Sequence, residues 1–174
     1  MATNDKTAEP ILTLTRVVNA PPEVVFKAWY EPDQFKQWFA PDGFSVPHCD
    51  IDLRPGGVLV FSMQSPQWLE GREIWSRGSF REVDVPRRTV SVVHFSDEKG
   101  NRLKPSAYGL SEDFPEELVM TVIFEPEDNG KKTQLTVTQS IPLSIAERNG
   151  APIGWGQTLD HLDAHLKKRT PEAY

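Results

Sequence analysis

The stretch WGQTLDHLDAHL, residues 155–166, decides the fold because it predicts one long amphipathic helix near the C-terminal end of the chain. Its apolar positions recur at i, i+4, i+7 and i+11 and form a single stripe, made of Trp155, Leu159, Leu162 and Leu166. Basic residues 167–169 complement the negative end of the helix dipole, and Pro171 stops the helix. Because glycine disfavours helix, Gly154 and Gly156 predict that the regular helix begins only near Trp155.

Upstream of this helix the sequence predicts seven strands and two short helices. The strands are expected where β-branched and aromatic residues gather between turn signals, at residues 11–18, 44–53, 58–63, 74–85, 89–95, 118–125 and 133–140. The first short helix follows Pro21 and Pro22, and the second restarts at Glu31. Glycines at the required turn positions connect neighbouring strands, as in residues 54–57 and 129–130.

This order of elements predicts an α+β fold in which a curved antiparallel sheet of about seven strands wraps around the long helix. One helix is narrower than such a sheet, so large side chains, the two short helices or a ligand must fill the remaining space. That mismatch indicates an internal cavity between the sheet and the helix. The polar stretch 96–117 is longer than an ordinary hairpin loop, which is typical of a lid or a mobile flap.

Several segments of the sequence resemble the activator-of-Hsp90-ATPase-like family. They are APPEVVFKAW at residues 20–29, FKQWF at 35–39, DLRPGG at 52–57, and Gly154-Trp155 followed by LDHL at 159–162. The resemblance runs from about Ile11 to Leu166, and the DLRPGG turn and the late Gly-Trp pair are its most specific parts. It implies the helix-grip fold of the START/Bet v 1-like superfamily, which encloses a hydrophobic pocket.

The resemblance leaves three functions open. Related bacterial proteins are mostly small-molecule or lipid binders, which implies a protein that holds a small hydrophobic or amphipathic ligand. Some superfamily members are cyclases or hydratases; such an enzyme would need a buried acid or base, for which His94, His165 and Glu73 are the candidates. The eukaryotic co-chaperone implies a third role, in stress response, as a partner of an Hsp90-type chaperone through the residues after Ser96 and the acidic surface. The additional N-terminal domain of that co-chaperone is not expected here.

The expected cavity would be lined by aromatic and other large side chains. The candidates that the fold suggests are Trp38, Phe39, Phe61, Met63, Trp75, His94, Tyr108, Trp155, Leu159 and His165. The indole N–H groups among them would add hydrogen-bond donors to an otherwise apolar wall. Tyr108, within the long polar stretch, is expected to close over the pocket.

A strand near residue 50 carries a histidine, two aspartates and the only cysteine. His48, Asp50 and Asp52 alternate along the strand and share one face, which is compatible with a metal site but is more typical of a solvent-facing strand edge. Cys49 has His48 as its nearest base, and neighbours on a strand face opposite ways, so a thiol nucleophile is not expected.

The long helix carries a second pair of histidines. His161 and His165 stand at i, i+4, a spacing that can bind zinc from one helix face, but Leu162 occupies the position where a zinc protease needs glutamate. We therefore interpret these side chains as solvated or half-buried, with His165 able to reach the rim of the cavity. No catalytic residue, metal site or cofactor is predicted from the sequence.

Bulk properties set the remaining expectations. A chain of 174 residues suits one domain, expected at residues 10–170 after a flexible tail at 1–9. The net charge of -6 disfavours nucleic acid and anionic membrane surfaces as partners. No apolar run approaches the roughly 20 residues needed for membrane insertion, and the single cysteine and the absence of a signal sequence favour the cytoplasm. An exposed sheet edge is compatible with a monomer or a homodimer.

Overall fold

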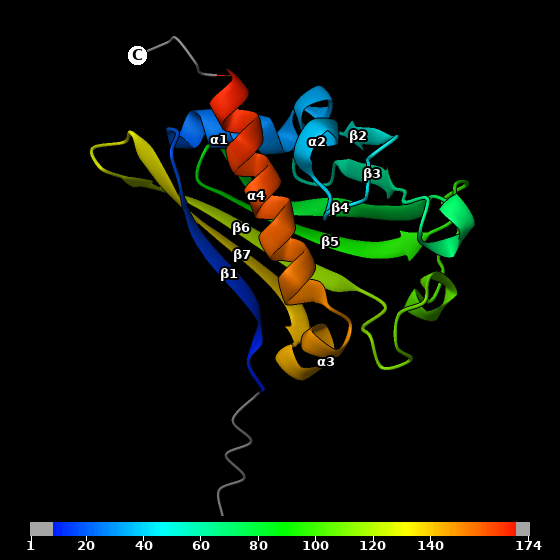
Figure 1. Ribbon diagram of the computed structural model, residues 1–174. Helices are drawn as coiled ribbons and strands as arrows, with labels where there is room; N and C mark the ends of the chain where they lie inside the picture. Colours follow the sequence, from blue (N-terminus) through cyan, green and yellow to red (C-terminus); the bar gives the residue numbers. More distant parts are fainter. Residues whose placement is uncertain (1–8, 170–174) are drawn as a thin grey trace, which may run out of the picture.

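The computed structural model describes residues 9–169, which form a seven-stranded antiparallel sheet in the order β1-β7-β6-β5-β4-β3-β2 (Figure 1). The strands are β1 (Ile11–Val18), β2 (Cys49–Ile51), β3 (Val58–Met63), β4 (Ile74–Asp84), β5 (Arg88–Ser96), β6 (Leu118–Glu127) and β7 (Lys132–Pro142). The helices are α1 (Pro22–Tyr30), α2 (Pro32–Trp38), α3 (Leu143–Arg148) and α4 (Ala151–Arg169), with 3-10 turns at Leu69–Gly71 and Pro105–Tyr108. The predicted α+β helix-grip fold is confirmed.

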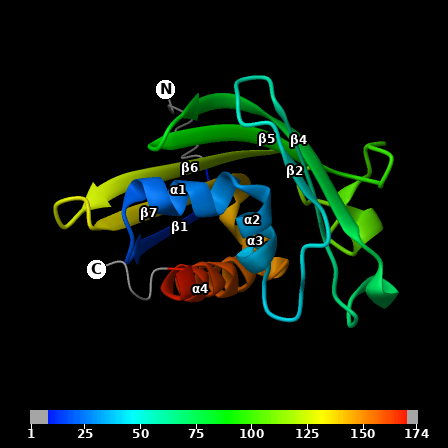
Figure 2. The same ribbon diagram turned by 90° about the horizontal axis from the view of Figure 1, so that it is seen from above.

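The sheet curves around the helices, as the view from above shows (Figure 2). Helix α4 packs against β1 and against α1, α2 and α3, while α1 also contacts β6 and β7. The helices therefore gather over the β1-β7-β6 side of the sheet, and α2 reaches across to β2. No helix within residues 9–169 combines the length and the apolar character that crossing a bilayer requires.

The strands match the predicted ones closely except at the edge of the sheet. A strand was expected over residues 44–53, but only Cys49–Ile51 pairs continuously with β3, and Ser45 forms an isolated bridge to Gln64. Pro47 lies between these two pairings and has no N–H to donate to a ladder. This accounts for the short edge strand.

Two features of the C-terminal region differ from the sequence-based expectation. Helix α4 begins at Ala151 rather than near Trp155, so Gly154 and Gly156 both lie inside it. Neither position requires glycine for lack of space. An added Cβ at Gly154 would meet only Pro41, at an ordinary 3.8 Å, and an added Cβ at Gly156 would meet nothing within 4 Å. Tertiary packing of the apolar stripe therefore outweighs the intrinsic cost of two glycines, about 1 kcal/mol each.

The other difference is helix α3, which was not predicted. It buries Ala146 against Leu12 and Ile141 in a small second core, and it ends before Gly150, whose φ is +73°. A glycine with positive φ just after a helix is a common stop signal. The pair Asn149-Gly150 was therefore the local signal that marked the end of this helix.

The expected tail at residues 1–9 lies outside the described residues except for Glu9. The carboxylate of Glu9 accepts a hydrogen bond of 3.0 Å from the backbone N–H of Ser144 at the start of α3. The end of the expected domain at residue 170 also lies outside the described part, which closes with α4 at Arg169.

An aromatic cluster holds the three main helices together at one side of the sheet. The Trp29 ring centroid lies 5.0 Å from that of Trp38 and 6.3 Å from that of Trp155, so side chains of α1, α2 and α4 meet there. The Trp38 indole donates a 2.9 Å hydrogen bond to the carbonyl of Ala28, which satisfies its buried N–H. Phe39 continues the cluster toward β3, with its ring 5.4 Å from that of Phe61.

We expect the core stripe of α4 to dominate its contribution to stability. Leu162 is fully buried, so Leu162→Ala should lower the free energy of unfolding by about 2–5 kcal/mol through lost burial and an unfilled cavity. Ile153, on the same helix, is 71% exposed, and Ile153→Ala should change that free energy by no more than about 0.5 kcal/mol. Urea unfolding of both variants tests this, and equal effects would contradict the packing described for α4.

Candidate functional site

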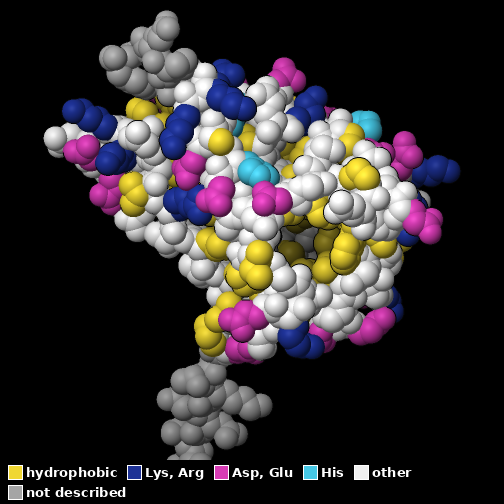
Figure 3. All heavy atoms as spheres, in the orientation of Figure 1, with side chains coloured by type: hydrophobic (Ala, Val, Ile, Leu, Met, Phe, Trp, Pro, Cys, Tyr) yellow, Lys and Arg dark blue, Asp and Glu magenta, His cyan; other side chains and the backbone are white. Residues whose placement is uncertain are grey.

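A pocket of about 410 Å³ opens on the inner side of the sheet, away from the part that α4 covers. It lies between strands β3 to β7, the loop after α2, the first half of α4 and the segment 97–117. Figure 3 shows the corresponding hollow, with hydrophobic side chains around its mouth. Its volume falls within the range of roughly 300–1,000 Å³ that is typical of small-molecule sites.

The sheet wall of the pocket follows from strand alternation. On β3 the pocket is lined by Leu59, Phe61 and Met63, every second residue, and on β4 Ser76 and Phe80 face the same way. On β5 the inward positions are Ser91, Val93 and Phe95, and β6 adds Leu118 and Met120. The wall is therefore mostly apolar and is interrupted by two serines.

The segment 97–117 forms the cover of the pocket at the far end of the sheet. Tyr108 and Phe114 are buried and line the pocket from this segment. The Tyr108 hydroxyl donates a 2.5 Å hydrogen bond to the carbonyl of Ser96 and accepts one of 3.3 Å from the backbone N–H of Trp75. These contacts anchor the covering segment to both β4 and β5.

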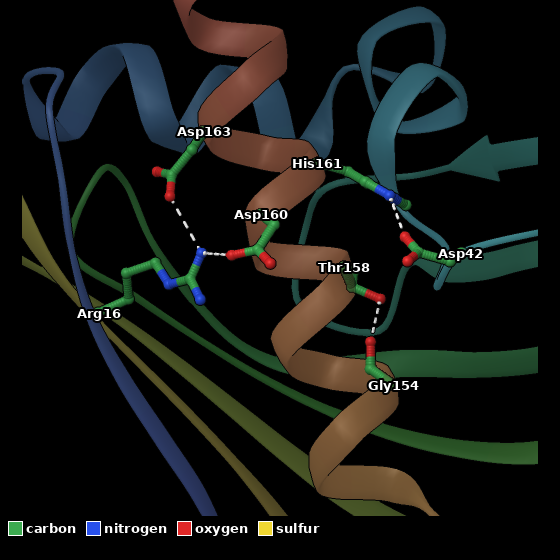
Figure 4. A network of polar contacts seen from close by, with 7 residues as sticks. All are labelled: Arg16, Asp42, Gly154, Thr158, Asp160, His161 and Asp163. Atoms are coloured by element: carbon green, nitrogen blue, oxygen red, sulfur yellow. Dashed lines mark hydrogen bonds and ion pairs between the residues drawn. The ribbon is translucent and has the colours of Figure 1, made fainter.

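On the opposite side of the mouth, the loop after α2 is tied to α4 (Figure 4). The two ring nitrogens of His161 lie 2.6 Å from the carbonyl oxygen of Ala40 and 2.7 Å from the carboxylate of Asp42. The backbone N–H of Asp42 also donates to the side-chain oxygen of Gln157 at 3.0 Å. His161 therefore fixes the rim of the pocket, and its role is structural in this arrangement.

The same close-up shows how α4 is held at its other flank. Arg16 of β1 donates to Asp160 at 2.5 Å and to Asp163 at 3.0 Å, while the Thr158 hydroxyl donates to the carbonyl of Gly154 at 2.8 Å (Figure 4). Thr158 and Gly154 line the pocket, whereas the Arg16 pairs lie on the other side of the helix. The ion pairs orient the helix and leave its Thr158 side to the pocket.

The structure places six of the ten predicted cavity residues at the pocket. They are Phe39, Phe61, Met63, His94, Tyr108 and Trp155. Outside its lining are Trp38, Trp75, Leu159 and His165. Trp38 and Leu159 are instead buried in the core, and the Trp75 ring stacks on that of His48 with centroids 5.0 Å apart on the outer face.

His94 borders the pocket, but its side chain belongs to the opposite face. It pairs with Arg77 on β4, whereas the next pair, Ser76 with Phe95, faces inward. Burial lowers the pKa of His94, and the nearby Arg102 lowers it further. His94 thus borders the pocket at a strand position whose parity directs the imidazole toward the outer face.

His165 does not reach the rim of the pocket. It is buried, and its Nε2 lies 3.0 Å from the side-chain oxygen of Gln34, which in turn donates a 2.6 Å hydrogen bond to Glu31. Burial lowers the pKa of His165, and the positive charges of Arg169 and Lys168 lower it further. The side chain therefore joins α4 to α2 in its neutral form.

The remaining candidates for chemistry lie on the outer face or lack reactivity. Glu73 accepts hydrogen bonds from the Ser62 hydroxyl at 3.0 Å and lies 2.7 Å from His48, all outside the pocket. Burial raises the pKa of the Cys49 thiol to about 12, so the thiol stays protonated near neutral pH. Within residues 9–169 no three potential ligands of the His, Cys, Asp and Glu types come together around a metal position.

The sequence interpretation missed several residues that line the pocket. Ser76, Ser91 and Gln139 face it from three strands, and the Gln139 side chain accepts a 3.1 Å hydrogen bond from the Trp155 indole. Strand alternation could have identified them. Ser76 lies an even number of residues from Phe80 on the same strand, so it faces the same side as that predicted core residue.

Comparison with known proteins gives a consistent family assignment. A sequence model of the family described as activator of Hsp90 ATPase homolog 1-like protein matches residues 19–167, while no curated protein matches the chain. A crystal structure of a protein from Nitrosomonas europaea has a TM-score of 0.72 at 26% identity, covering 95% of this chain and 99% of that chain. A solution structure from Staphylococcus epidermidis gives a TM-score of 0.73 at 25% identity, covering 97% and 95% of the two chains.

A further crystal structure, of an AHSA1 protein from Silicibacter pomeroyi, shows the same fold. Its TM-score is 0.68 at 21% identity, and the superposition covers 92% of this chain and 99% of that chain.

The environment of His165 predicts a pH dependence of stability. Its pKa is lowered in the folded state, so between that value and about 6.5, the ordinary pKa of histidine, the unfolded chain binds more protons. The contribution of His165 to the free energy of unfolding is therefore fully present above about pH 6.5 and is lost as the pH falls toward its folded pKa. His165→Gln should reduce this slope by up to about 1.4 kcal/mol per pH unit. Urea unfolding between pH 5 and 7.5 measures the slope, and an unchanged slope in the variant would contradict the assignment.

Proposed function

The chain belongs to the activator of Hsp90 ATPase homolog 1-like family, and within it we propose that this protein binds a small hydrophobic or amphipathic molecule in the pocket beside α4. The single observation that carries the proposal is the pocket itself. It has the volume of a small-ligand site, and aromatic and aliphatic side chains form most of its wall. Such a wall stabilises an apolar ligand by removing its surface from water.

The residues around the pocket favour binding over turnover. A general acid or base must face the reacting atoms. Of the three candidates from the sequence, His165 and Glu73 lie outside the lining, and His94 borders the pocket at a strand position of outward parity. Tyr30 lies at the pocket, but it is hydrogen-bonded to Thr89, and burial raises the pKa of its hydroxyl further above its usual range. Glu116 is exposed at the mouth of the pocket.

The binding role can be tested by filling the pocket. Val93 faces the pocket from β5, so Val93→Trp should weaken binding of the neutral fluorescent probe N-phenyl-1-naphthylamine at least tenfold by occupying its space. Val90, on the same strand with the opposite parity, provides the matched control, and Val90→Trp should leave binding unchanged. A fluorescence titration measures both dissociation constants.

Two outcomes would count against the proposal. Wild-type protein that fails to bind the probe at micromolar concentrations would remove the ligand-binding role. Equal weakening by the two tryptophan variants would place the probe outside the pocket.

The family description supports a second candidate role, that of a partner of an Hsp90-type chaperone. The region that the sequence suggested for this contact, residues 97–117, buries Tyr108 and Phe114 against the pocket, so a partner would meet mainly its polar and charged side chains. If this role holds, adding the protein should stimulate ATP hydrolysis by a purified Hsp90-type chaperone. An unchanged hydrolysis rate would remove the candidate.

A further inference from the structure

Two serines on the pocket wall have hydroxyls without a hydrogen-bond partner in the described residues. Ser76 is 5% exposed and Ser91 is 4% exposed, and both line the pocket. Neither side chain has a hydrogen-bond partner within residues 9–169. Within residues 9–169 the side-chain polar atom that is both fully buried and unpartnered is Nε of Arg77, so the two serine hydroxyls are accessible from the pocket. A polar group of a bound molecule could replace water at each of them and form a hydrogen bond.

The contrast with the other buried polar side chains is sharp. The remaining eight in residues 9–169 each make a side-chain hydrogen bond: Gln34, Ser62, Ser65, Thr89, Ser96, Thr133, Thr158 and His165. The two exceptions are thus both at the pocket. Their hydroxyls are free to bind a polar group of a molecule held there.

The strand register sets the spacing of the two hydroxyls. Ser76 of β4 pairs with Phe95 of β5, and Ser91 of β5 pairs with Phe80 of β4, so the serines lie four residues apart along the strands. At about 3.3 Å per residue this is a separation of roughly 13 Å along the wall. The pair between them is Gly78 with Val93, so Val93 is the side chain that stands on the wall between the two serines.

The charges around the pocket restrict the ligand further. No lysine or arginine is among the described residues that line it, and its one carboxylate, that of Glu116, is at the exposed mouth. Arg16, on the inner face of β1, is already paired with Asp160 and Asp163. A ligand carboxylate buried here would lack a cation to balance it, which is strongly unfavourable.

On the basis of the proposed binding role, we infer that the pocket selects an elongated, uncharged ligand with a hydroxyl or carbonyl oxygen toward each end. One oxygen bonds to the Ser76 hydroxyl and the other to the Ser91 hydroxyl, while the apolar middle of the ligand packs against Val93. Carboxylate-bearing ligands such as free fatty acids are excluded by the missing counter-charge.

The test compares two probes of equal chain length, 1,12-dodecanediol and dodecanoate, as competitors of N-phenyl-1-naphthylamine at pH 8. The diol should displace the fluorophore at least tenfold more effectively than the carboxylate. Ser76→Ala and Ser91→Ala should each weaken diol binding about fivefold, the effect of one lost neutral hydrogen bond, and leave binding of the fluorophore unchanged. Ser79→Ala, an exposed position of β4 with outward parity, is the matched control and should change neither.

Folding provides an independent check, because removing a hydroxyl that has no internal partner should not destabilise the protein. Both alanine variants should unfold at the wild-type urea midpoint or above it. If the wild type binds the fluorophore but shows no preference for the diol, or if the serine variants match Ser79→Ala, this inference fails while the binding role stands. If the wild type does not bind the fluorophore, the binding role fails first.

Discussion

One helix is narrower than a sheet of seven strands, and the rest of the structure depends on this constraint. Helix α4 covers the side of the sheet near β1, and the aromatic cluster of Trp29, Trp38 and Trp155 holds α1 and α2 beside it. Beyond this cluster, α2 reaches β2 at the edge of the sheet, and the segment 97–117 lines the pocket at its far end. The pocket is the space that remains between the sheet and the elements that cover it.

The covers are held by polar contacts at their edges, whereas the interior of the pocket is apolar. Tyr108 fixes one cover through Ser96 and Trp75, and His161 fixes the other through Ala40 and Asp42. Hydrogen bonds at the rim specify geometry without placing charge inside the pocket. The orientation of the covers and the apolar character of the pocket therefore depend on different residues.

Much of the fold was predictable because hairpin strands and an amphipathic helix leave strong periodic signals. The start of α4 was not, since burial of its stripe outweighs the local preference of Gly154 and Gly156. The pocket was harder to predict for a similar reason: Trp38 and Trp155 are equally apolar in sequence, and only tertiary packing buries the first in the core and sets the second at the pocket. His94 borders the pocket, while strand parity gives the inward position to Phe95.

The segment 97–117 leaves the sheet after β5 and returns to it at β6, two strands that pair directly with each other. Its ends are therefore fixed by the ladder, while its length and composition are not constrained by strand register. A change in the length or composition of this segment would therefore alter the cover of the pocket without altering the pairing of β5 with β6.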